Sequence, residues 1–262
     1  MDLELRGKRA LVTAASRGLG RASATALAQE GASVAVAGRD PARMADLVER
    51  LTAAGAAEAF AVPLDLSRAE TLAPAVDKAV ERFGGLDIFV GNTGGPVSGP
   101  FLDIPRSQWQ RALDEILLAM VDLCHAAIPH LRKSGSGRIL FVTTVGVKIV
   151  QPNMVLSDAI RLAIVGMAKS LSLELASDGI TVNCLCPGPF KTDRMEDLIA
   201  ASMARDDIER AAAEAIWLDE VPVGSFGDPM DFGAMVAFLC SPRSRFTTGT
   251  AMALDGGKSR AY

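Results

Sequence analysis

The sequence predicts a doubly wound α/β fold with three layers, in which a seven-stranded parallel sheet lies between two layers of helices. Short apolar segments alternate with longer helical patterns from one end of the chain to the other, and this alternation is typical of the fold. The short segments are apolar throughout, as expected of parallel strands that helices cover on both faces. No internal repeat or long linker divides the 262 residues, so the sequence predicts one domain over 1–262.

The expected elements follow one another in order along the chain. The strands are expected at 10–14, 33–37, 59–62, 86–90, 138–143, 181–185 and 251–254. The helical patterns cover 19–30, 41–53, 69–82, 107–131, 156–176 and 228–240. The segment 190–226 is the longest between two strands, and its apolar side chains predict a lid over a ligand. Core packing or subunit contact explains the same side chains equally well.

Composition excludes several classes of protein. Hydrophobic residues make up 49% and charged residues 22%, as in ordinary globular proteins. No apolar run approaches the ~18–20 residues that span a membrane, and the charged N-terminus does not resemble a signal peptide. The net charge of −4 argues against nucleic acid as a partner. Four cysteines without metal-ligand spacing predict no metal site and favour a reducing, cytoplasmic location.

Two of the expected helices are apolar on more than one face. These are the helices near 107–131 and 156–176, and a helix that is apolar all round must be covered on all sides. One face packs on the sheet, and we expect the other to contact a second subunit in a homodimer or homotetramer. The alternative is that the chain's own C-terminal segments cover it.

A glycine-containing turn follows the first expected strand. It reads Thr13-Ala14-Ala15-Ser16-Arg17-Gly18-Leu19-Gly20 and leads directly into a helix. Glycines at such a turn let the backbone approach a pyrophosphate, which the free N–H groups and the dipole of the helix N-terminus stabilise. The turn therefore predicts a dinucleotide site at the carboxyl end of the first strand.

Further motifs occur at the ends of later strands. They are Asp65-Leu66, Gly91-Asn92-Thr93-Gly94, Pro187-Gly188-Pro189-Phe190-Lys191-Thr192 and Asp255-Gly256-Gly257. Together with the glycine turn, these motifs make nearly the whole chain resemble the short-chain dehydrogenase/reductase family, whose members have a Rossmann fold. The resemblance implies that Asp65 lies at the adenine, Asn92 beside the ribose and Thr192 near the nicotinamide amide. The predicted cofactor-binding residues are Thr13, Ser16, Arg17, Gly18, Leu19, Gly20, Arg39, Asp65, Leu66, Asn92, Gly94, Arg161, Pro187, Gly188 and Thr192.

The first glycine of the family's turn is replaced by Ala14. An alanine is harmless there if the φ angle is negative, and it adds a methyl group near the turn. Because Gly18 and Gly20 remain, we expect the pyrophosphate site to be intact.

The residues after the second strand predict NADP(H) rather than NAD(H). NAD-specific members carry an acidic side chain at this point, but this chain reads Gly38-Arg39-Asp40-Pro41. Arg39 can pair with a 2′-phosphate, with Arg17 as a second cation. Asp40 precedes a proline that opens a helix, so we expect it to be an N-cap. A solvated turn residue is the alternative for Arg39.

The resemblance also shows where the family's catalytic residues belong. The serine position is Thr144, the tyrosine position thirteen residues later is Ser157, and the lysine position is Arg161. The asparagine position on the preceding long helix is Ile116. The only tyrosine in the chain is Tyr262, its last residue, so no shift of register places a tyrosine on this helix.

The changed set still predicts a site for hydride transfer. Thr144 can hold a substrate oxygen, and Arg161 lies four residues from Ser157, on the same helix face. Arg161 keeps a positive charge but does not exchange a proton near neutral pH. Losing a positioned acid costs ~10²–10⁴ in rate, and Arg161 can offset part of that by stabilising a developing alkoxide.

Two other ionisable side chains lie near this set. Lys148 follows Thr144 in a loop that we expect to overhang the substrate, where it can donate a proton or bind an acidic substrate; a solvated lysine is the alternative. Asp158 adjoins Ser157 but points about 100° around the helix, which favours a structural role.

These observations predict an NADP(H)-dependent oxidoreductase that acts on a carbonyl or alcohol substrate. Two alternatives remain open. One is an NADP(H)-binding sensor or partner protein with weak or no catalysis, and the other is a lyase or isomerase on the same fold. The substrate and the direction of the reaction do not follow from the sequence.

Overall fold

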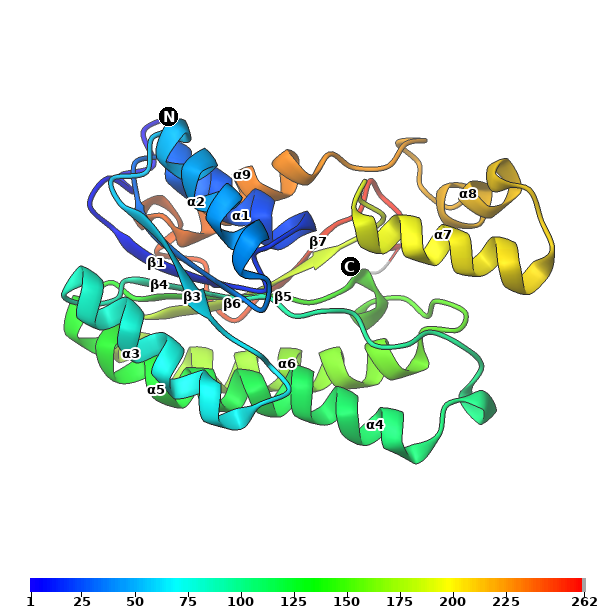
Figure 1. Ribbon diagram of the computed structural model, residues 1–262, viewed down its shortest axis with the longest axis horizontal. Helices are drawn as coiled ribbons and strands as arrows, with labels where there is room; N and C mark the ends of the chain where they lie inside the picture. Colours follow the sequence, from blue (N-terminus) through cyan, green and yellow to red (C-terminus); the bar gives the residue numbers. More distant parts are fainter. Residues whose placement is uncertain (261–262) are drawn as a thin grey trace.

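A computed structural model describes residues 1–260, so Tyr262 lies outside the described residues. Seven parallel strands form one sheet in the order β3-β2-β1-β4-β5-β6-β7, which confirms the predicted doubly wound fold. Helices α1, α2 and α9 lie on one side of the sheet and α3, α5 and α6 on the other (Figure 1). The strand order reverses between β1 and β4, where ligands bind in open sheets of this kind.

Both ends of every strand agree with the predicted segments to within two residues. They are β1 (Arg9–Thr13), β2 (Ser33–Gly38), β3 (Ala59–Pro63), β4 (Ile88–Gly91), β5 (Arg138–Val142), β6 (Thr181–Pro187) and β7 (Ala251–Leu254). Register is parallel throughout, with Ala10 of β1 opposite Val34 of β2 and Ile88 of β4. The carboxyl ends of β1, β4, β5 and β6 therefore meet at one edge of the sheet.

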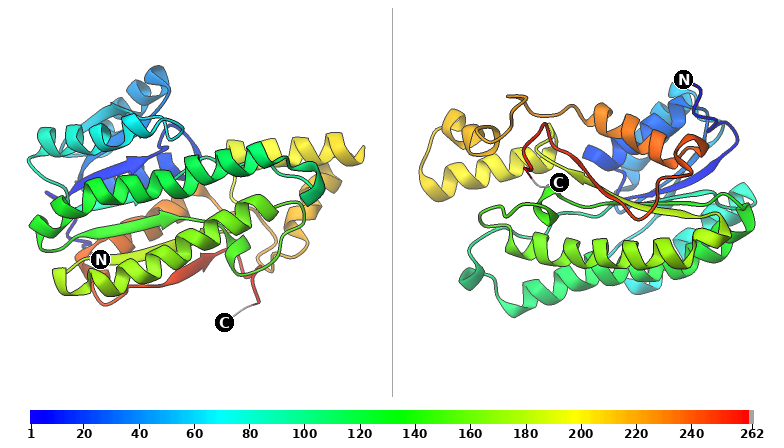
Figure 2. Two further views of the ribbon diagram at one scale, coloured as in Figure 1. Left: turned by 90° about the horizontal axis from the view of Figure 1, so that it is seen from below. Right: turned by 180° about the vertical axis from the view of Figure 1, so that it is seen from behind.

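The helices connect the strands and extend beyond the sheet at one end. They are α1 (Gly18–Gln29), α2 (Pro41–Ala54), α3 (Leu72–Phe83), α4 (Arg106–Ala112), α5 (Ala119–Ser134), α6 (Val155–Glu174), α7 (Asp193–Asp206), α8 (Arg210–Leu218) and α9 (Pro229–Cys240). Short 3₁₀ turns lie at Ala69–Thr71, Phe101–Asp103, Val145–Val147, Ala176–Asp178 and Pro242–Ser244. Helices α7 and α8 project past the same end of the sheet as α4 (Figure 2).

The long helix predicted at 107–131 is not uniform. A π-helical turn over Leu113–Leu118 separates α4 from α5, and Ile116 is buried within this turn. The segment is helical, as predicted, but the π-helical turn at its centre was not predicted, because apolar periodicity does not distinguish an α-helical turn from a π-helical one. Such turns occur often at functional sites.

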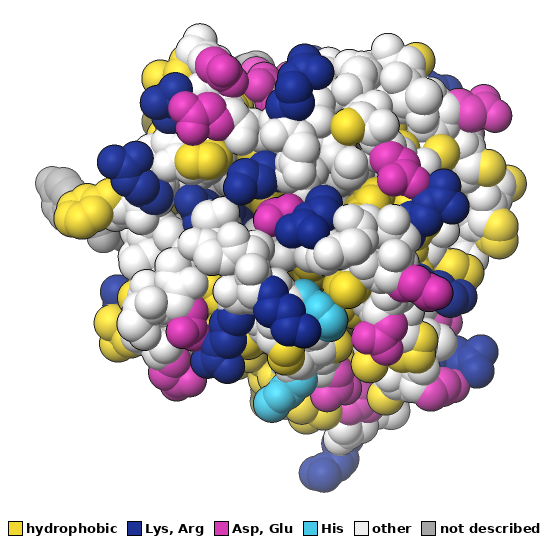
Figure 3. Space-filling model, turned by 90° about the vertical axis from the view of Figure 1, so that its left-hand side faces the viewer, with side chains coloured by type: hydrophobic (Ala, Val, Ile, Leu, Met, Phe, Trp, Pro, Cys, Tyr) yellow, Lys and Arg dark blue, Asp and Glu magenta, His cyan; other side chains and the backbone are white. Residues whose placement is uncertain are grey.

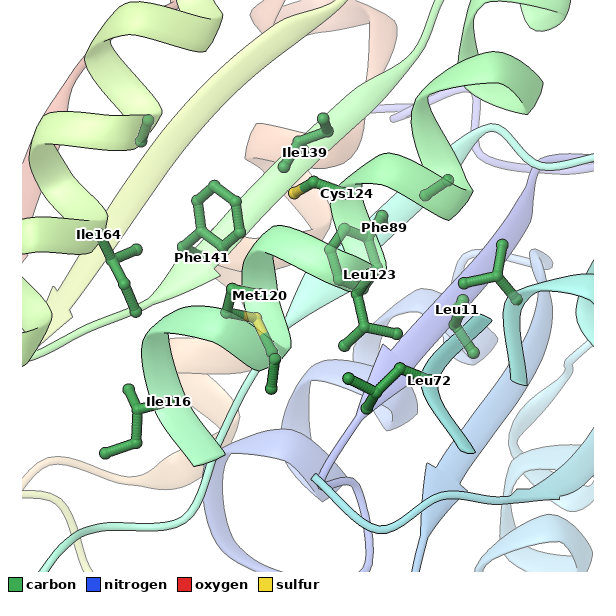
Figure 4. Close-up of a cluster of buried hydrophobic side chains, with 14 of the residues drawn as sticks. Leu11, Leu72, Phe89, Ile116, Met120, Leu123, Cys124, Ile139, Phe141 and Ile164 are labelled. Atoms are coloured by element: carbon green, nitrogen blue, oxygen red, sulfur yellow. The ribbon is translucent and has the colours of Figure 1, made fainter. Parts of the chain in front are cut away.

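Two apolar cores cover the two faces of the sheet. Phe89 and Phe141 of the sheet pack against Met120 and Leu123 of α5 and Ile164 of α6 (Figure 4). On the opposite face, Phe232 of α9 and side chains of α1 and α2 cover the strands. Strands buried on both faces explain why the sequence segments are apolar throughout.

The surface seen from one end of the sheet carries Lys, Arg, Asp and Glu side chains that are interspersed (Figure 3). No single-sign patch dominates this face, as expected from the small net charge. Cys124, Cys184, Cys186 and Cys240 are all buried free thiols. Among the described residues, no helix is long and apolar enough to cross a membrane, and no cluster of side chains could hold a metal ion.

Candidate active site

The carboxyl edge of the sheet opens into one large cavity of ≈ 730 Å³. Most of the predicted site residues line it: Ser16, Arg17, Gly18, Leu19, Arg39, Asp65, Leu66, Asn92, Gly94, Thr144, Ser157, Arg161, Pro187, Gly188 and Thr192. The structure therefore brings the predicted dinucleotide residues and the predicted catalytic residues into a single space. Thr13 and Gly20 do not line the cavity, but they contact residues that do: Thr13 bonds to Asn92, and Gly20 packs against Ala14.

Thr13 and Asn92 join the turns after β1 and β4. The Thr13 hydroxyl donates to the Asn92 carbonyl oxygen (2.7 Å) and accepts from the Asn92 backbone N–H (2.9 Å). The Asn92 side-chain amide donates to the Ala14 carbonyl oxygen at 3.2 Å. These bonds fix the two turns relative to each other, so Asn92 shapes the turn as well as lining the cavity.

Glycines in the turn after β1 and in the motif after β6 allow the backbone to pack closely around the cavity. A Cβ atom on Gly20 would come 2.5 Å from the Ala14 carbonyl oxygen, and one on Gly188 would come 2.6 Å from the Asp255 Cα. Gly18 has a φ of +54°, which favours glycine. The first N–H groups of α1 have no intrahelical partners and are free for an anion. The turn therefore fits a dinucleotide pyrophosphate.

Ala14 has a φ of +46°, in the left-handed region. The condition under which alanine would be harmless at this position is therefore not met. A non-glycine residue in this region costs about 1 kcal/mol. The hydrogen bond from the Asn92 amide to the Ala14 carbonyl helps to hold the strained residue in place.

Arginines surround the end of the cavity beyond β2. Arg39 and Arg43 both line it, and Asp40 accepts a hydrogen bond from the Arg43 backbone N–H at 3.1 Å. Asp40 is thus the N-cap of α2, as predicted. Burial raises the pKa of Asp65, but hydrogen bonds from Ser67 and the charge of Arg39 outweigh it and hold the pKa below its usual range.

The side chains at the family's catalytic positions line the same cavity. Thr144 follows β5 and accepts a hydrogen bond from the Gly146 N–H at 3.2 Å. Ser157 and Arg161 extend from α6, and both are buried. Ile116 lines the same region from the π-helical turn. The set thus contains two hydroxyl groups and one buried cation.

Arg161 is held by three neutral oxygens. Its Nη1 donates to the Val142 carbonyl oxygen (2.9 Å), and its Nη2 donates to Thr93 Oγ1 and the Gly94 carbonyl oxygen (both 3.0 Å). Burial lowers the pKa of Arg161 to about 10, and the charge of Arg194 adds to the shift. Arg161 stays positively charged at neutral pH and joins α6 to the ends of β4 and β5.

Part of the segment 190–226 lines the cavity. Met195 and Ile199 of α7 pack on Ala213 of α8 in a small apolar cluster of their own. Leu198 and Trp217 line the cavity. Outside it, Lys258 Nζ lies 5.8 Å from the centroid of the Trp217 ring, which ties α8 to the C-terminal segment.

The comparisons with known proteins agree with this geometry. A family model described as enoyl-(acyl carrier protein) reductase matches residues 13–259. A 3-oxoacyl-[acyl-carrier-protein] reductase from Chlamydia pneumoniae is 30% identical over 257 residues, which are 98% of this chain and 99% of that protein. The chain belongs to the short-chain dehydrogenase/reductase family. It is an oxidoreductase of this family.

Other relatives within the family act on sugar-derived compounds, by their names. A 2-keto-3-deoxy-L-fuconate dehydrogenase from Xanthomonas campestris is 32% identical, covering 98% of this chain and 82% of that protein. The structure of an L-sorbose reductase from Gluconobacter frateurii, complexed with NADPH and L-sorbose, has a TM-score of 0.93 and 26% identity over the whole of both chains. A dehydrogenase/reductase from Sinorhizobium meliloti has a TM-score of 0.88 and 33% identity, covering 98% and 97% of the two chains.

Sequence reasoning missed three residues of this dehydrogenase/reductase site. Thr93 accepts from Arg161, and Arg43 and Arg194 line the cavity. Arg194 follows Thr192 of the Pro-Gly-x-x-x-Thr motif by two residues, in the first turn of a helix at the carboxyl edge of the sheet, and that position was the available signal. Lys148 is half-buried and does not line the cavity.

Asp158 packs against the loop that carries Thr144. Its half-buried carboxylate lies so close to Gly146 that any side chain there would overlap it, and its Oδ1 is buried without a partner among the described residues. Burial raises the pKa of Asp158 to about 6, although Arg161 opposes the shift. The carboxylate is thus a loop contact outside the cavity lining.

We expect Asp158 to make the stability of the protein depend on pH. Its folded-state pKa of about 6 lies above the unfolded value, so its contribution to stability is complete below pH ~4 and is lost as the pH rises through ~6. Asp158→Asn removes the charge, and we expect it to be more stable than the wild type by about 1–2 kcal/mol at pH 8. Urea unfolding at pH 4.5 and pH 8 measures the difference, and an advantage that does not grow with pH would exclude Asp158 as the cause.

Proposed function

We propose that this chain is an NADP(H)-dependent oxidoreductase that interconverts a carbonyl and an alcohol at a site formed by Thr144, Ser157 and Arg161. The observation that carries the proposal is the single cavity, in which these three side chains and the glycine turn share one space. The relatives named as reductases and dehydrogenases support the same reaction class. NADP(H) supplies or accepts the hydride.

Arg161 has the main electrostatic role in this proposal. As the carbonyl carbon accepts a hydride, negative charge develops on the carbonyl oxygen, and a fixed cation stabilises it best where water is excluded. Three hydrogen bonds to neutral oxygens hold the buried guanidinium in place. No reorganisation is then needed as the charge develops.

Thr144 and Ser157 orient the substrate oxygen as hydrogen-bond donors. Neither hydroxyl is acidic enough to replace a tyrosine, whose phenol has a pKa of about 10. Arg161 keeps its proton at neutral pH, so the proton that completes the alcohol comes from water. A rate below that of a tyrosine-dependent enzyme is expected, by a factor of ~10²–10⁴ before the contribution of Arg161.

The preference for NADP(H) over NAD(H) is also proposed. Gly38 at the end of β2 has no carboxylate for the ribose hydroxyls, and Arg39 and Arg43 line the cavity beside it. Arg17 also lines the cavity, with Nη1 3.5 Å from the Asp193 carboxylate. Two of the similar structures are described with NADPH, the L-sorbose reductase and an NADPH-dependent reductase of bacilysin biosynthesis.

Arg39→Ala tests this preference. We expect NADPH affinity to fall about 10–100-fold and NADH affinity to stay unchanged, because only the 2′-phosphate loses a charge-assisted contact. Fluorescence titrations of both dinucleotides measure it. Arg50→Ala on α2, the helix that follows Arg39, is the control, because Arg50 pairs with Asp46 at 2.9 Å outside the cavity. Equal losses for NADH and NADPH would contradict the role of Arg39.

The same titrations separate the proposal from its rivals. No binding of either dinucleotide would favour a lyase or isomerase that retains the fold. Binding without turnover on any carbonyl or alcohol would favour a sensor or partner protein. No feature of the described residues specifically favours a lyase, an isomerase or a sensor protein.

Two further proposals concern assembly and location. Leu118 at the start of α5, and Leu162 and Leu173 of α6, are exposed apolar side chains (43%, 54% and 73%), and they support contact with a second subunit through the helices near 107–131 and 156–176. A homodimer or homotetramer remains the proposed state. Four buried free thiols support a cytoplasmic location.

A further inference from the structure

The guanidinium groups of two arginines, one on α6 and one on α7, donate hydrogen bonds to the same loop. The loop is Thr93-Gly94-Gly95-Pro96, which follows β4 and lines the cavity. Arg161 of α6 donates to Thr93 and Gly94, and Arg194 of α7 donates from Nη2 to the Pro96 carbonyl oxygen at 2.8 Å. The two cations therefore lie close together on one loop of the cavity wall.

Gly95 allows Arg194 to take this place. A Cβ atom on Gly95 would come 2.7 Å from Arg194 Nε and 2.9 Å from its Cζ. The φ angle of Gly95 is not positive, so its backbone conformation does not require glycine. The lack of a side chain serves the close approach of the guanidinium, which is thus part of a formed site rather than a freely solvated side chain.

Neither cation has an acidic partner within the described residues. The other arginines of the cavity form ion pairs, Arg17 with Asp193, Arg43 with Asp40 and Arg111 with Glu115, or lie beside Asp65 in the case of Arg39. Arg161 contacts only neutral oxygens.

Two acids lie in the surroundings of this pair of cations. Asp197 lines the cavity near Arg194, and Asp158 acts on Arg161 from outside the lining, but neither comes within ion-pair distance. Burial lowers the pKa of Arg194, and Asp197 opposes the shift. An anion that enters the cavity beside this loop would therefore be attracted by two largely uncompensated charges.

Arg194 can also donate further hydrogen bonds. A guanidinium carries five N–H groups in a planar fork, and Pro96 accepts from one of them. In the described part of the chain, the others have no acceptor, so the fork can bind the two oxygens of a carboxylate side by side. Val97, Met154, Leu198 and Trp217 line the same cavity and offer apolar contact for a short carbon chain.

We propose that Arg194 binds the carboxylate of the substrate, so that the enzyme acts on oxo acids and the corresponding hydroxy acids. The inference rests on the proposed function, because it places the reacting carbonyl beside Thr144, Ser157 and Arg161. The carboxylate enters as an anion and leaves unchanged. A substrate with the same carbonyl but no charge lacks this contact.

Calorimetric titration of the NADP⁺-saturated protein tests the proposal without turnover. Saturation with NADP⁺ fills the phosphate sites, so an anion that binds afterwards does not occupy them. The probes are 2-oxobutanoate, acetoacetate and the methyl esters of both acids. At least one acid is expected to bind about 10–100-fold more tightly than its ester.

Arg194→Gln is expected to remove that preference, because the affinity for the oxo acid falls about 10–100-fold. The affinities for the ester and for NADPH are expected to change less than about twofold. Arg194→Lys keeps the charge but not the planar fork. Its affinity for the oxo acid should therefore lie between the affinities of the wild type and of Arg194→Gln. Arg205→Gln is the control, because Arg205 lies on the same helix and pairs with Asp206 outside the cavity.

Each result decides between the possibilities. Equal affinity for acid and ester, or no binding of either, would overturn the carboxylate site. Loss of NADPH binding in Arg194→Gln would assign Arg194 to a cofactor phosphate instead. Steady-state assays with NADPH and the same probes then test the proposed reaction separately, since a carboxylate can bind to a protein that transfers no hydride.

Discussion

Replacing Arg161 with alanine is expected to lower kcat/KM by about 10³-fold or more and to destabilise the protein by about 2–4 kcal/mol. The activity falls because the cation is the strongest electrostatic group at the reacting oxygen in the proposed site. The stability falls because the Val142 and Gly94 carbonyl oxygens and the Thr93 hydroxyl lose their common donor in a buried region. Steady-state kinetics and urea unfolding at one protein concentration measure the two effects.

Arg161→Lys separates the two contributions. The ammonium group keeps the charge and up to three donors, so we expect it to recover part of the stability and part of the rate. Arg82→Ala is a matched control, because Arg82 is exposed and pairs with Glu58 at 2.6 Å; it should change stability by less than about 1 kcal/mol. Wild-type turnover in Arg161→Ala would remove the proposed catalytic role.

Replacing Gly20 with alanine is expected to weaken NADPH binding by about 100-fold or more and to destabilise the fold by about 1–3 kcal/mol. The new Cβ would lie 2.5 Å from the Ala14 carbonyl oxygen and 2.7 Å from Asn92 Nδ2. It would force the glycine turn away from the turn after β4 and break the hydrogen bond between Asn92 and Ala14. The gain in helix propensity, about 1 kcal/mol, offsets only part of the loss.

Fluorescence titration with NADPH and urea unfolding measure the effect of Gly20→Ala. Gly99→Ala is the control, because nothing lies within 4 Å of a Cβ at that position. If Gly20→Ala retained NADPH affinity to within a factor of about two, the close approach of α1 to the Ala14 carbonyl would not be what forms the dinucleotide site.

The fold was predictable because its signals are local and repeated. Parallel strands covered on both faces are apolar throughout, and each is followed by a helical pattern, so sequence alone predicts the order of elements. Asp40 and Pro41 predicted the start of α2 in the same way, through N-cap chemistry. The π-helical turn at Leu113–Leu118 has no such signal, because the apolar periodicity of a π-helical turn does not differ recognisably from that of an α-helical one.

The site was predictable where motifs identify positions, and less so where tertiary contacts decide. The changed catalytic set of Thr144, Ser157 and Arg161 follows from counting residues, and the structure gathers all three in one cavity. The left-handed conformation of Ala14 does not follow, since alanine rarely adopts it and the Asn92 hydrogen bond lies far away in sequence. Arg194 was missed because its approach to the loop after β4 depends on Gly95, 99 residues earlier.

The most direct test of the central claim is the transfer of deuterium from NADPH labelled at C4 of the nicotinamide. Both stereoisomers of the labelled cofactor are incubated with the protein and a panel of carbonyl compounds that includes the oxo acids above, and the alcohol products are analysed by mass spectrometry. We expect deuterium in the product from one stereoisomer, and a loss of the label transfer in Arg161→Ala. NADPH binding without deuterium in any product would contradict the central claim and would leave a dinucleotide-binding protein that does no redox chemistry on these compounds.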